Sequence, residues 1–248
     1  MAKTALVTGA AAGIGRACAK RLARDGIQVG ILDLDKASAQ KVVDEIEAEG
    51  GKALALGASI ADRPAIQAAV QELRDKFGPV TIVVNNAGIT AFDKFDTITD
   101  EQWDKVFEIN TKGTFIVTQV VYPDMKAAKW GRVVNISSSS AQGGSPMQIH
   151  YSASKGAVMA MTRSMAQAFG RHGITVNNIP PGAVMQTVMS EAQKDSWPIS
   201  EDEIAKSLPV QRTGVPEDIA SACAWLCQED AGYVTGQTIG VNGGRIMS

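Results

Sequence analysis

The sequence alternates short apolar runs with longer amphipathic segments along most of its 248 residues. The expected strands are Thr4–Thr8, Gln28–Leu32, Lys52–Leu56, Ile82–Asn85, Arg132–Ile136, Thr175–Ile179 and Thr238–Val241. The expected helices are Gly15–Arg24, Lys36–Glu49, Pro64–Lys76, Glu101–Met125, Tyr151–Gly170 and Pro216–Gln228. The strand runs lack strict polar alternation, which is typical of strands buried on both faces. This pattern predicts an α/β fold in which helices cover both faces of a parallel, doubly wound sheet.

Length and composition exclude several classes of protein. The length is near the upper limit for one hydrophobic core, so we expect a single domain over residues 1–248. A net charge of −2 does not favour a nucleic-acid or anionic-membrane surface. The sequence contains no apolar run of about 18 residues, so no membrane-spanning helix is predicted. With no signal peptide in view and three cysteines, too few for a disulfide framework, we expect a cytoplasmic protein.

One long segment, Ala183–Leu208, interrupts the alternation. It contains Met185, Met189 and Trp197, with a break at Pro198. Connections of this length are often lids over a site, and the apolar side chains favour a substrate cover. The alternative is a surface insertion without a role in binding.

The first strand leads into a glycine-rich turn, Thr8–Gly15, before a helix. Glycines at positions 9, 13 and 15 permit a sharp turn, and the helix N-terminus offers free N–H groups to a pyrophosphate. The spacing G-x-x-x-G-x-G differs from the general dinucleotide fingerprint, so by itself it is also compatible with a simple tight turn.

An acid ends the second expected strand. Asp33 follows Gly13 by twenty residues. A carboxylate there accepts hydrogen bonds from an adenosine ribose and repels a 2′-phosphate, which favours NAD over NADP. The alternative is a solvated loop carboxylate, since Asp35 follows closely.

Tyr151 and Lys155 lie four residues apart at the start of an expected helix, on one face. A phenol with a pKa of about 10 is a poor base, and a nearby ammonium favours phenolate. Ser138, just past an expected strand, could donate to a reacting oxygen. Alone, the Tyr–Lys spacing most often indicates a surface pair; together with the glycine turn and the serine it becomes specific.

These motifs together resemble the short-chain dehydrogenase/reductase family over essentially the whole chain. The matching residues are Thr8–Gly15, Asn85–Gly88, Asn110, Ser138, Tyr151, Lys155, Pro181–Gly182, Arg212–Ala220 and Thr235–Gln237. The resemblance implies a Rossmann-like sheet of seven strands in the order 3-2-1-4-5-6-7. It also implies a homotetramer built through the two long helices, Glu101–Met125 and Tyr151–Gly170.

The resemblance assigns four catalytic roles. Tyr151 would be the general acid/base, and Ser138 would orient and polarise the reacting oxygen. Lys155 would bind the nicotinamide ribose and lower the tyrosine pKa. Asn110 would hold a water that relays protons from Lys155, unless it is merely a polar interruption in a long helix.

The resemblance also implies a set of NAD-binding residues. They are Gly9, Gly13, Ile14, Gly15, Asp33, Ser59, Asn86, Ala87, Gly88, Tyr151, Lys155, Pro181, Gly182, Val184 and Thr187. Two positions depart from the family pattern. Ser59 stands where an Asp commonly reads the adenine, and Thr187 is displaced by one residue from the usual Pro-Gly-x-x-x-Thr spacing, so Gln186 is also a candidate.

The expected substrate residues flank the catalytic motifs or lie on the expected lid. They are Ser140, Gln148, His150, Met185 and Trp197, with Thr90–Phe92 and Gln142 nearby. The mixture suits a medium-sized ketone or secondary alcohol with an additional polar group. His150 has an alternative role in capping its helix or lining the rim. No metal site is expected, since Cys223 and Cys227 lack two further ligands.

Three functions remain open at this stage. The favoured hypothesis is an NAD-dependent dehydrogenase that interconverts a small-molecule secondary alcohol and a ketone. An enzymatic alternative is a 3-oxoacyl-thioester reductase acting on acyl carrier protein or CoA substrates, which Asp33 disfavours because many such enzymes use NADP. A non-catalytic NAD sensor is the third, and the complete Ser–Tyr–Lys–Asn set argues against it.

Overall fold

The computed structural model describes residues 3–187, 190–191 and 200–247. Its sheet has six parallel strands in the order β3-β2-β1-β4-β5-β6, which confirms the predicted doubly wound α/β class. The strands are β1 (Thr4–Thr8), β2 (Gln28–Asp33), β3 (Ala53–Gly57), β4 (Val80–Asn85), β5 (Gly131–Ile136) and β6 (Ile174–Ile179). The strand order reverses between β1 and β4, which is where such sheets bind ligands at their carboxyl ends.

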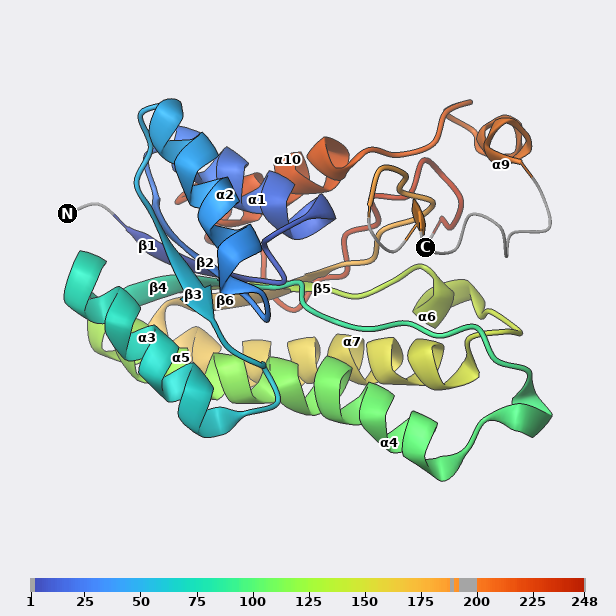
Figure 1. Ribbon diagram of the computed structural model, residues 1–248, viewed down its shortest axis with the longest axis horizontal. Coiled ribbons are helices and arrows are strands. Elements are labelled where there is room, and N and C mark those ends of the chain that lie inside the picture. The colour runs from blue at the N-terminus through green and yellow to red at the C-terminus, as the bar shows by residue number, and fades with distance from the viewer. Residues whose placement is uncertain (1–2, 188–189, 192–199, 248) are drawn as a thin grey trace.

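Helices form a layer on each face of the sheet (Figure 1). One layer contains α1 (Gly13–Arg24), α2 (Lys36–Ala48) and α10 (Pro216–Leu226), and the other contains α3 (Arg63–Phe77), α5 (Thr114–Ala128) and α7 (Ile149–Phe169). Neighbouring residues of one strand pack into different layers: Ala5 and Val7 face α1, whereas Leu6 faces α3 and α5. This double burial explains why the strands are apolar without alternation.

The expected seventh strand, Thr238–Val241, is reduced to two isolated bridges alongside the end of β6. Asn178 pairs with Thr238, and Pro181 pairs with Val241. A regular parallel ladder between them would need an N–H at position 180. Pro180 has none, so the ladder is interrupted there.

The long helix expected over Glu101–Met125 is divided into three parts. It begins as α4 (Asp100–Phe107), widens into the π-helix η2 (Glu108–Gly113) and continues as α5. Its start is confirmed by a capping box between Thr99 and Gln102. π-helical turns inside helices are frequent at functional sites.

Shorter helices gather at the carboxyl ends of the strands and in connections. They are η1 (Phe95–Thr97), α6 (Ser140–Gly143), η3 (Gly170–His172) and α9 (Glu201–Ser207). In Figure 1, α6, α9 and the C-terminus lie toward the same end of the sheet. None of the described helices is long and apolar enough to cross a membrane.

Candidate active site

The glycine turn between β1 and α1 folds tightly on itself. Gly9 and Gly13 adopt positive φ angles of 61° and 51°. A Cβ on Gly15 would lie 2.2 Å from the carbonyl oxygen of Gly9, so no larger residue fits. Free N–H groups at the start of α1 therefore face the end of the sheet, where a pyrophosphate finds both hydrogen-bond donors and a positive dipole.

The Asp33 carboxylate lies beside this turn at the end of β2. Its Oδ2 accepts a hydrogen bond from the Ala11 N–H at 3.0 Å, and its Oδ1 accepts from the Leu34 N–H at 2.8 Å. These bonds fix the carboxylate next to the glycine backbone, where a ribose would lie. Ser59 follows β3, and its hydroxyl accepts from the Ala61 N–H at 3.3 Å.

The end of β4 is tied to the glycine turn. The Asn86 side chain donates to the carbonyl oxygens of Thr8 and Gly9, both at 3.0 Å. Asn85 points into the core instead, and donates to Thr118 and Asn135, so its role is structural. Ala87 packs against the turn, since a Cβ on Gly9 would lie 2.8 Å from its Cα.

Asn110, in the π-helix η2, is fully buried and holds the backbone that follows Gly88. Its Oδ1 accepts from the Ile89 N–H at 2.8 Å, and its Nδ2 donates to the Ile89 carbonyl at 2.9 Å and to Ser154 at 3.0 Å. A Cβ on Gly88 would lie 2.8 Å from Asn110 Oδ1 and 3.2 Å from Lys155 Nζ. The asparagine therefore positions the wall beside Lys155, a contact that the sequence did not reveal.

The Ser138 hydroxyl, just past β5, is oriented by Ser140. Its oxygen accepts hydrogen bonds from the Ser140 N–H at 3.1 Å and from the Ser140 hydroxyl at 2.9 Å. Ser138 also forms a hydrogen bond with Tyr151. The serine hydroxyl is therefore held beside the phenol, at the wall of the cavity.

Tyr151 and Lys155 lie in the first two turns of α7 and are buried. The lysine Nζ is 5.8 Å from the centre of the tyrosine ring and donates to the Ile136 carbonyl at 3.0 Å. Burial lowers the pKa of Lys155 from 10.5 to about 8. Lys155 therefore gives up its proton more readily than an exposed lysine does.

The expectation that Lys155 lowers the tyrosine pKa is not met in the protein alone. Burial raises the pKa of the Tyr151 phenol, and a hydrogen bond with Ser138 acts in the opposite direction more weakly. The physical reason is desolvation: removing water from the phenolate costs more than one neighbouring hydroxyl restores. The Lys155 ammonium meanwhile donates to Ile136.

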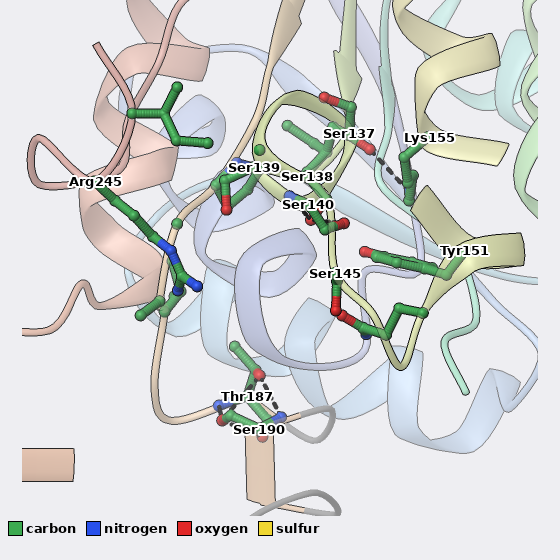
Figure 2. A pocket seen from close by; sticks show the side chains of 18 of the residues that line it. Ser137, Ser138, Ser139, Ser140, Ser145, Tyr151, Lys155, Thr187, Ser190 and Arg245 are labelled. Carbon is green, nitrogen blue, oxygen red and sulfur yellow. Dashed lines mark hydrogen bonds between the residues drawn. The ribbon is translucent and has the colours of Figure 1, made fainter. Parts of the chain in front are cut away.

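A cavity of about 690 Å³ opens at this end of the sheet (Figure 2). Figure 2 shows Ser138, Ser140, Tyr151 and Lys155 on one side of it, with Thr187 and Ser190 across from them. The predicted residues that line it are Ile14, Asn86, Gly88, Ser138, Ser140, Gln148, Tyr151, Lys155, Pro181, Gly182, Val184 and Thr187. Three of the four catalytic candidates and nine of the fifteen expected cofactor residues therefore share one space.

Two of the expected substrate residues that the structure describes, His150 and Met185, do not line this cavity. His150 is fully buried, with Nε2 3.4 Å from Asp93 Oδ2. One residue along a helix rotates a side chain by about 100°, so it leaves the face that Tyr151 occupies. Met185 packs into a small cluster with Ile204 and Leu208. Trp197 lies outside the described residues.

The structure accommodates the displaced threonine by an unusual backbone conformation. Gln186, the additional residue, has a positive φ of 60°, which non-glycine residues rarely adopt. Thr187 consequently lies over the glycine turn, where its side chain would be 3.3 Å from a Cβ on Gly13. Its hydroxyl accepts from the Ser190 N–H at 2.9 Å.

Several cavity residues were missed by reasoning from the sequence. They are Ile204 and Ser207 of α9, Gly143 at the end of α6 with the residues 144–146 that follow it, and Arg245 and Ile246 near the C-terminus. One signal was present for the last two: they follow the expected strand Thr238–Val241, and the ends of parallel strands meet at one edge. Gly243 and Gly244, with φ angles of 64° and 83°, turn the chain there.

Residues 3–197 match the family model described as short chain dehydrogenase. The chain therefore belongs to the short-chain dehydrogenase/reductase family, and it is an oxidoreductase that binds a nicotinamide cofactor.

Particular relatives cover nearly the whole chain. The 3-oxoacyl-[acyl-carrier-protein] reductase FabG of Staphylococcus aureus is 38% identical over 248 residues, covering 100% of this chain and 99% of the relative. The (2S)-[(R)-hydroxy(phenyl)methyl]succinyl-CoA dehydrogenase subunit BbsD of Thauera aromatica is 38% identical over 246 residues, covering 99% and 97%. The solved structure of a single-residue variant of actinorhodin polyketide ketoreductase with NADPH has a TM-score of 0.92 at 34% identity, covering 98% and 97%.

Proposed function

We propose that this protein is an NAD(H)-dependent enzyme that interconverts a small secondary alcohol and a ketone. The observation that carries the proposal is the orientation of Ser138. Ser140 holds its hydroxyl through two hydrogen bonds, and a third joins it to Tyr151. A donor held next to a phenol in a cavity is suited to a carbonyl or alcohol oxygen.

The residues divide the chemistry between them. When bound, the nicotinamide ring supplies or accepts the hydride at the substrate carbon. During reduction, Ser138 donates a hydrogen bond to the carbonyl oxygen, and Tyr151 transfers its proton to that oxygen as the carbon–hydrogen bond forms. During oxidation both transfers reverse. After reduction the tyrosinate must regain a proton, and Lys155, whose pKa is about 8 and whose Nζ lies 5.8 Å from the centre of the tyrosine ring, would supply it.

The glycine turn fits the cofactor because its backbone leaves no room for side chains. Gly15 tolerates no Cβ, and Thr187 closes the turn from the opposite side. Asn110 fixes the wall at Gly88 beside Lys155. Relay of protons through a water at Asn110 remains a prediction, as does the homotetramer.

The preference for NAD rests on the charges around the adenosine end. Asp33 lies beside the glycine turn and would repel a 2′-phosphate. Two basic side chains of this region are already paired, Arg16 with Glu45 at 2.6 Å and Lys36 with Glu72 at 3.4 Å.

A second candidate is a reductase of 3-oxoacyl thioesters. The relatives favour it, since one is named as a 3-oxoacyl-[acyl-carrier-protein] reductase and one as a (2S)-[(R)-hydroxy(phenyl)methyl]succinyl-CoA dehydrogenase subunit. The structural neighbour contains NADPH, which is opposite to the preference that Asp33 supports. Coenzyme preference and substrate class are therefore separate questions.

One experiment tests the coenzyme assignment. We expect Asp33→Ala to weaken NADH binding about tenfold while NADPH binding changes little or improves, because the variant loses both a ribose acceptor and a repulsive charge. Dissociation constants by fluorescence, with turnover of a ketone panel using each coenzyme, measure this. Asp62→Ala, which removes only a cap of α3, is the matched control. A wild-type preference for NADPH contradicts the proposal.

A further inference from the structure

Arg245 places a positive charge on the cavity wall opposite the catalytic serines. Figure 2 shows its side chain extending toward the cavity from the C-terminal segment, across from Ser139 and Ser140. The residue is exposed. Among the described residues its guanidinium has no ion pair or hydrogen bond, whereas Arg212 on the same side of the sheet pairs with Asp218 at 2.7 Å.

The charges of the cavity are of one sign. Arg245 and Lys155 are its cations, and no aspartate or glutamate is among the described residues that line it. Lys155 is buried on the floor and donates to Ile136, whereas Arg245 lies at the rim. Most of the other described residues that line the cavity are serines, glycines or apolar residues.

The segment that carries Arg245 is held in place. The Asn242 side chain donates to the Ile246 carbonyl at 3.0 Å, and it accepts from the Gly244 N–H at 3.0 Å. The Arg245 N–H donates to the Asn242 carbonyl at 3.1 Å. Ile246 reaches Gly143 of α6. Because the backbone of this segment is already ordered, it loses little entropy when Arg245 binds a ligand.

We propose that Arg245 selects substrates that carry an anionic group, a carboxylate or a phosphate, on the side of the molecule away from the reacting carbonyl. This inference rests on the proposed oxidoreductase function and adds the charge of its substrate. The planar guanidinium binds either anion through paired N–H donors. Ser138 and Tyr151 hold the reacting oxygen while Arg245 holds the other end.

Two matched pairs of ketones test the proposal and separate the two anions. Acetoacetate is compared with methyl acetoacetate, and acetoacetyl-CoA with its N-acetylcysteamine thioester. In Arg245→Gln we expect kcat/KM to fall about tenfold for the anionic member through KM, and less than twofold for the neutral member. A fall in kcat/KM for acetoacetate identifies a carboxylate as the recognised anion, and a fall for acetoacetyl-CoA identifies a phosphate.

Control variants separate charge recognition from structure. Arg245→Lys keeps the charge and should retain part of the preference. Lys52→Gln removes one positive charge near the start of β3, at the opposite edge of the sheet, and should change neither pair. Raising the salt concentration should weaken the anionic substrate selectively in the wild type and not in Arg245→Gln.

A binding measurement does not depend on turnover. Hexanoate and hexanamide are titrated calorimetrically into the enzyme saturated with NADH. If the recognised anion is a carboxylate, we expect hexanoate to bind the wild type more tightly than hexanamide does. Arg245→Gln should bind the two ligands equally. Inorganic phosphate is the corresponding probe if the recognised anion is a phosphate. Failure of the wild type to reduce any ketone while this preference persists contradicts the proposed function only. Equal losses for charged and neutral ligands, no preference in the wild type, or a loss confined to the coenzyme KM overturns the role of Arg245.

Discussion

The two ends of the cavity are built in different ways. The coenzyme end is organised around one continuous turn, Thr8–Gly15, whose shape is set by backbone contacts such as the close approach of Gly15 to Gly9, and Asp33, Asn86 and Thr187 pack onto it. The substrate end is assembled from separate segments, including α6, α9 and the residues around Arg245. Its packing is thin, since the cluster beneath α9 comprises Ala183, Met185, Ile204 and Leu208. One end is fixed by local geometry, and the other depends on distant parts of the chain meeting.

This difference separates what must stay constant from what can vary. A pyrophosphate and a hydride donor impose the same geometry whatever the substrate, and backbone atoms supply it. Charge and shape at the other end are supplied by side chains such as Arg245, which can be exchanged without disturbing the core. Substitutions at the two ends should therefore have effects of different kinds.

The largest effect is expected where the two ends meet. Tyr151→Phe should lower kcat by about a thousandfold, since it removes the proton donor and leaves the ring packing in place. Coenzyme affinity should change little, because the turn at Gly9 and Gly13 is untouched. Single-turnover kinetics and a coenzyme titration measure the two quantities. Residual activity above a tenth of the wild type would assign proton transfer to another group.

The next effect concerns the stability of the cavity floor. Lys155 has a pKa of about 8 in the folded protein against 10.5 ordinarily, so the unfolded chain binds more protons between these values. The contribution of this group to stability therefore rises as pH increases from 8 to 10.5, by up to about 3 kcal/mol. Lys155→Met should lack this rise.

Urea unfolding of both proteins between about pH 7 and pH 10 provides the test. The wild type should gain stability relative to Lys155→Met as pH increases, and Lys52→Met, altered at an exposed lysine, should follow the wild type. If the difference in the free energy of unfolding between Lys155→Met and the wild type did not change with pH, Lys155 would be solvated. The floor of the cavity would then be as loosely packed as its rim.

The smallest effects compare the two ends directly. Gly15→Ala should destabilise the fold by about 1–3 kcal/mol, because its Cβ would meet the Gly9 carbonyl at 2.2 Å, and it should weaken coenzyme binding. Ile204→Ala should lower stability by about 1 kcal/mol or less and raise the substrate KM, because its cluster is small and lies near the surface. Thermal unfolding with separate KM values for coenzyme and ketone reports both. Comparable losses of coenzyme affinity in Gly15→Ala and Ile204→Ala would contradict the separation of the cavity into a coenzyme end and a substrate end.

The sequence revealed the parts of the molecule whose information is local. Strand positions, the glycine turn and the spacing of Tyr151 and Lys155 each occupy a short window. Arg245 and Ile204 could not be assigned, because their place in the cavity depends on how separate segments return to the sheet. His150 was misplaced because adjacency in a helix is not adjacency in space.

The interruption of the seventh strand had a different cause. Pairing with Thr238–Val241 needs the backbone N–H of residue 180, and Pro180 has none. The sequence alone did not show that this N–H would be needed. The direction of the Tyr151 pKa also lay beyond the sequence, because it depends on how completely water is removed from the phenol.

The π-helical turn η2 gives one helical rod two different orientations. A π turn holds about one extra residue, so the side chains of α4 are rotated by roughly 100° from the phase that α5 would have continued. α5 can thus present its apolar face to β4 while α4 lies against α7. Deleting one residue within Glu108–Gly113 would bring the two halves into phase and turn Asn110 away from Ile89. The wall beside Lys155 therefore depends on an irregularity in the helix, and a more regular helix would build a poorer enzyme.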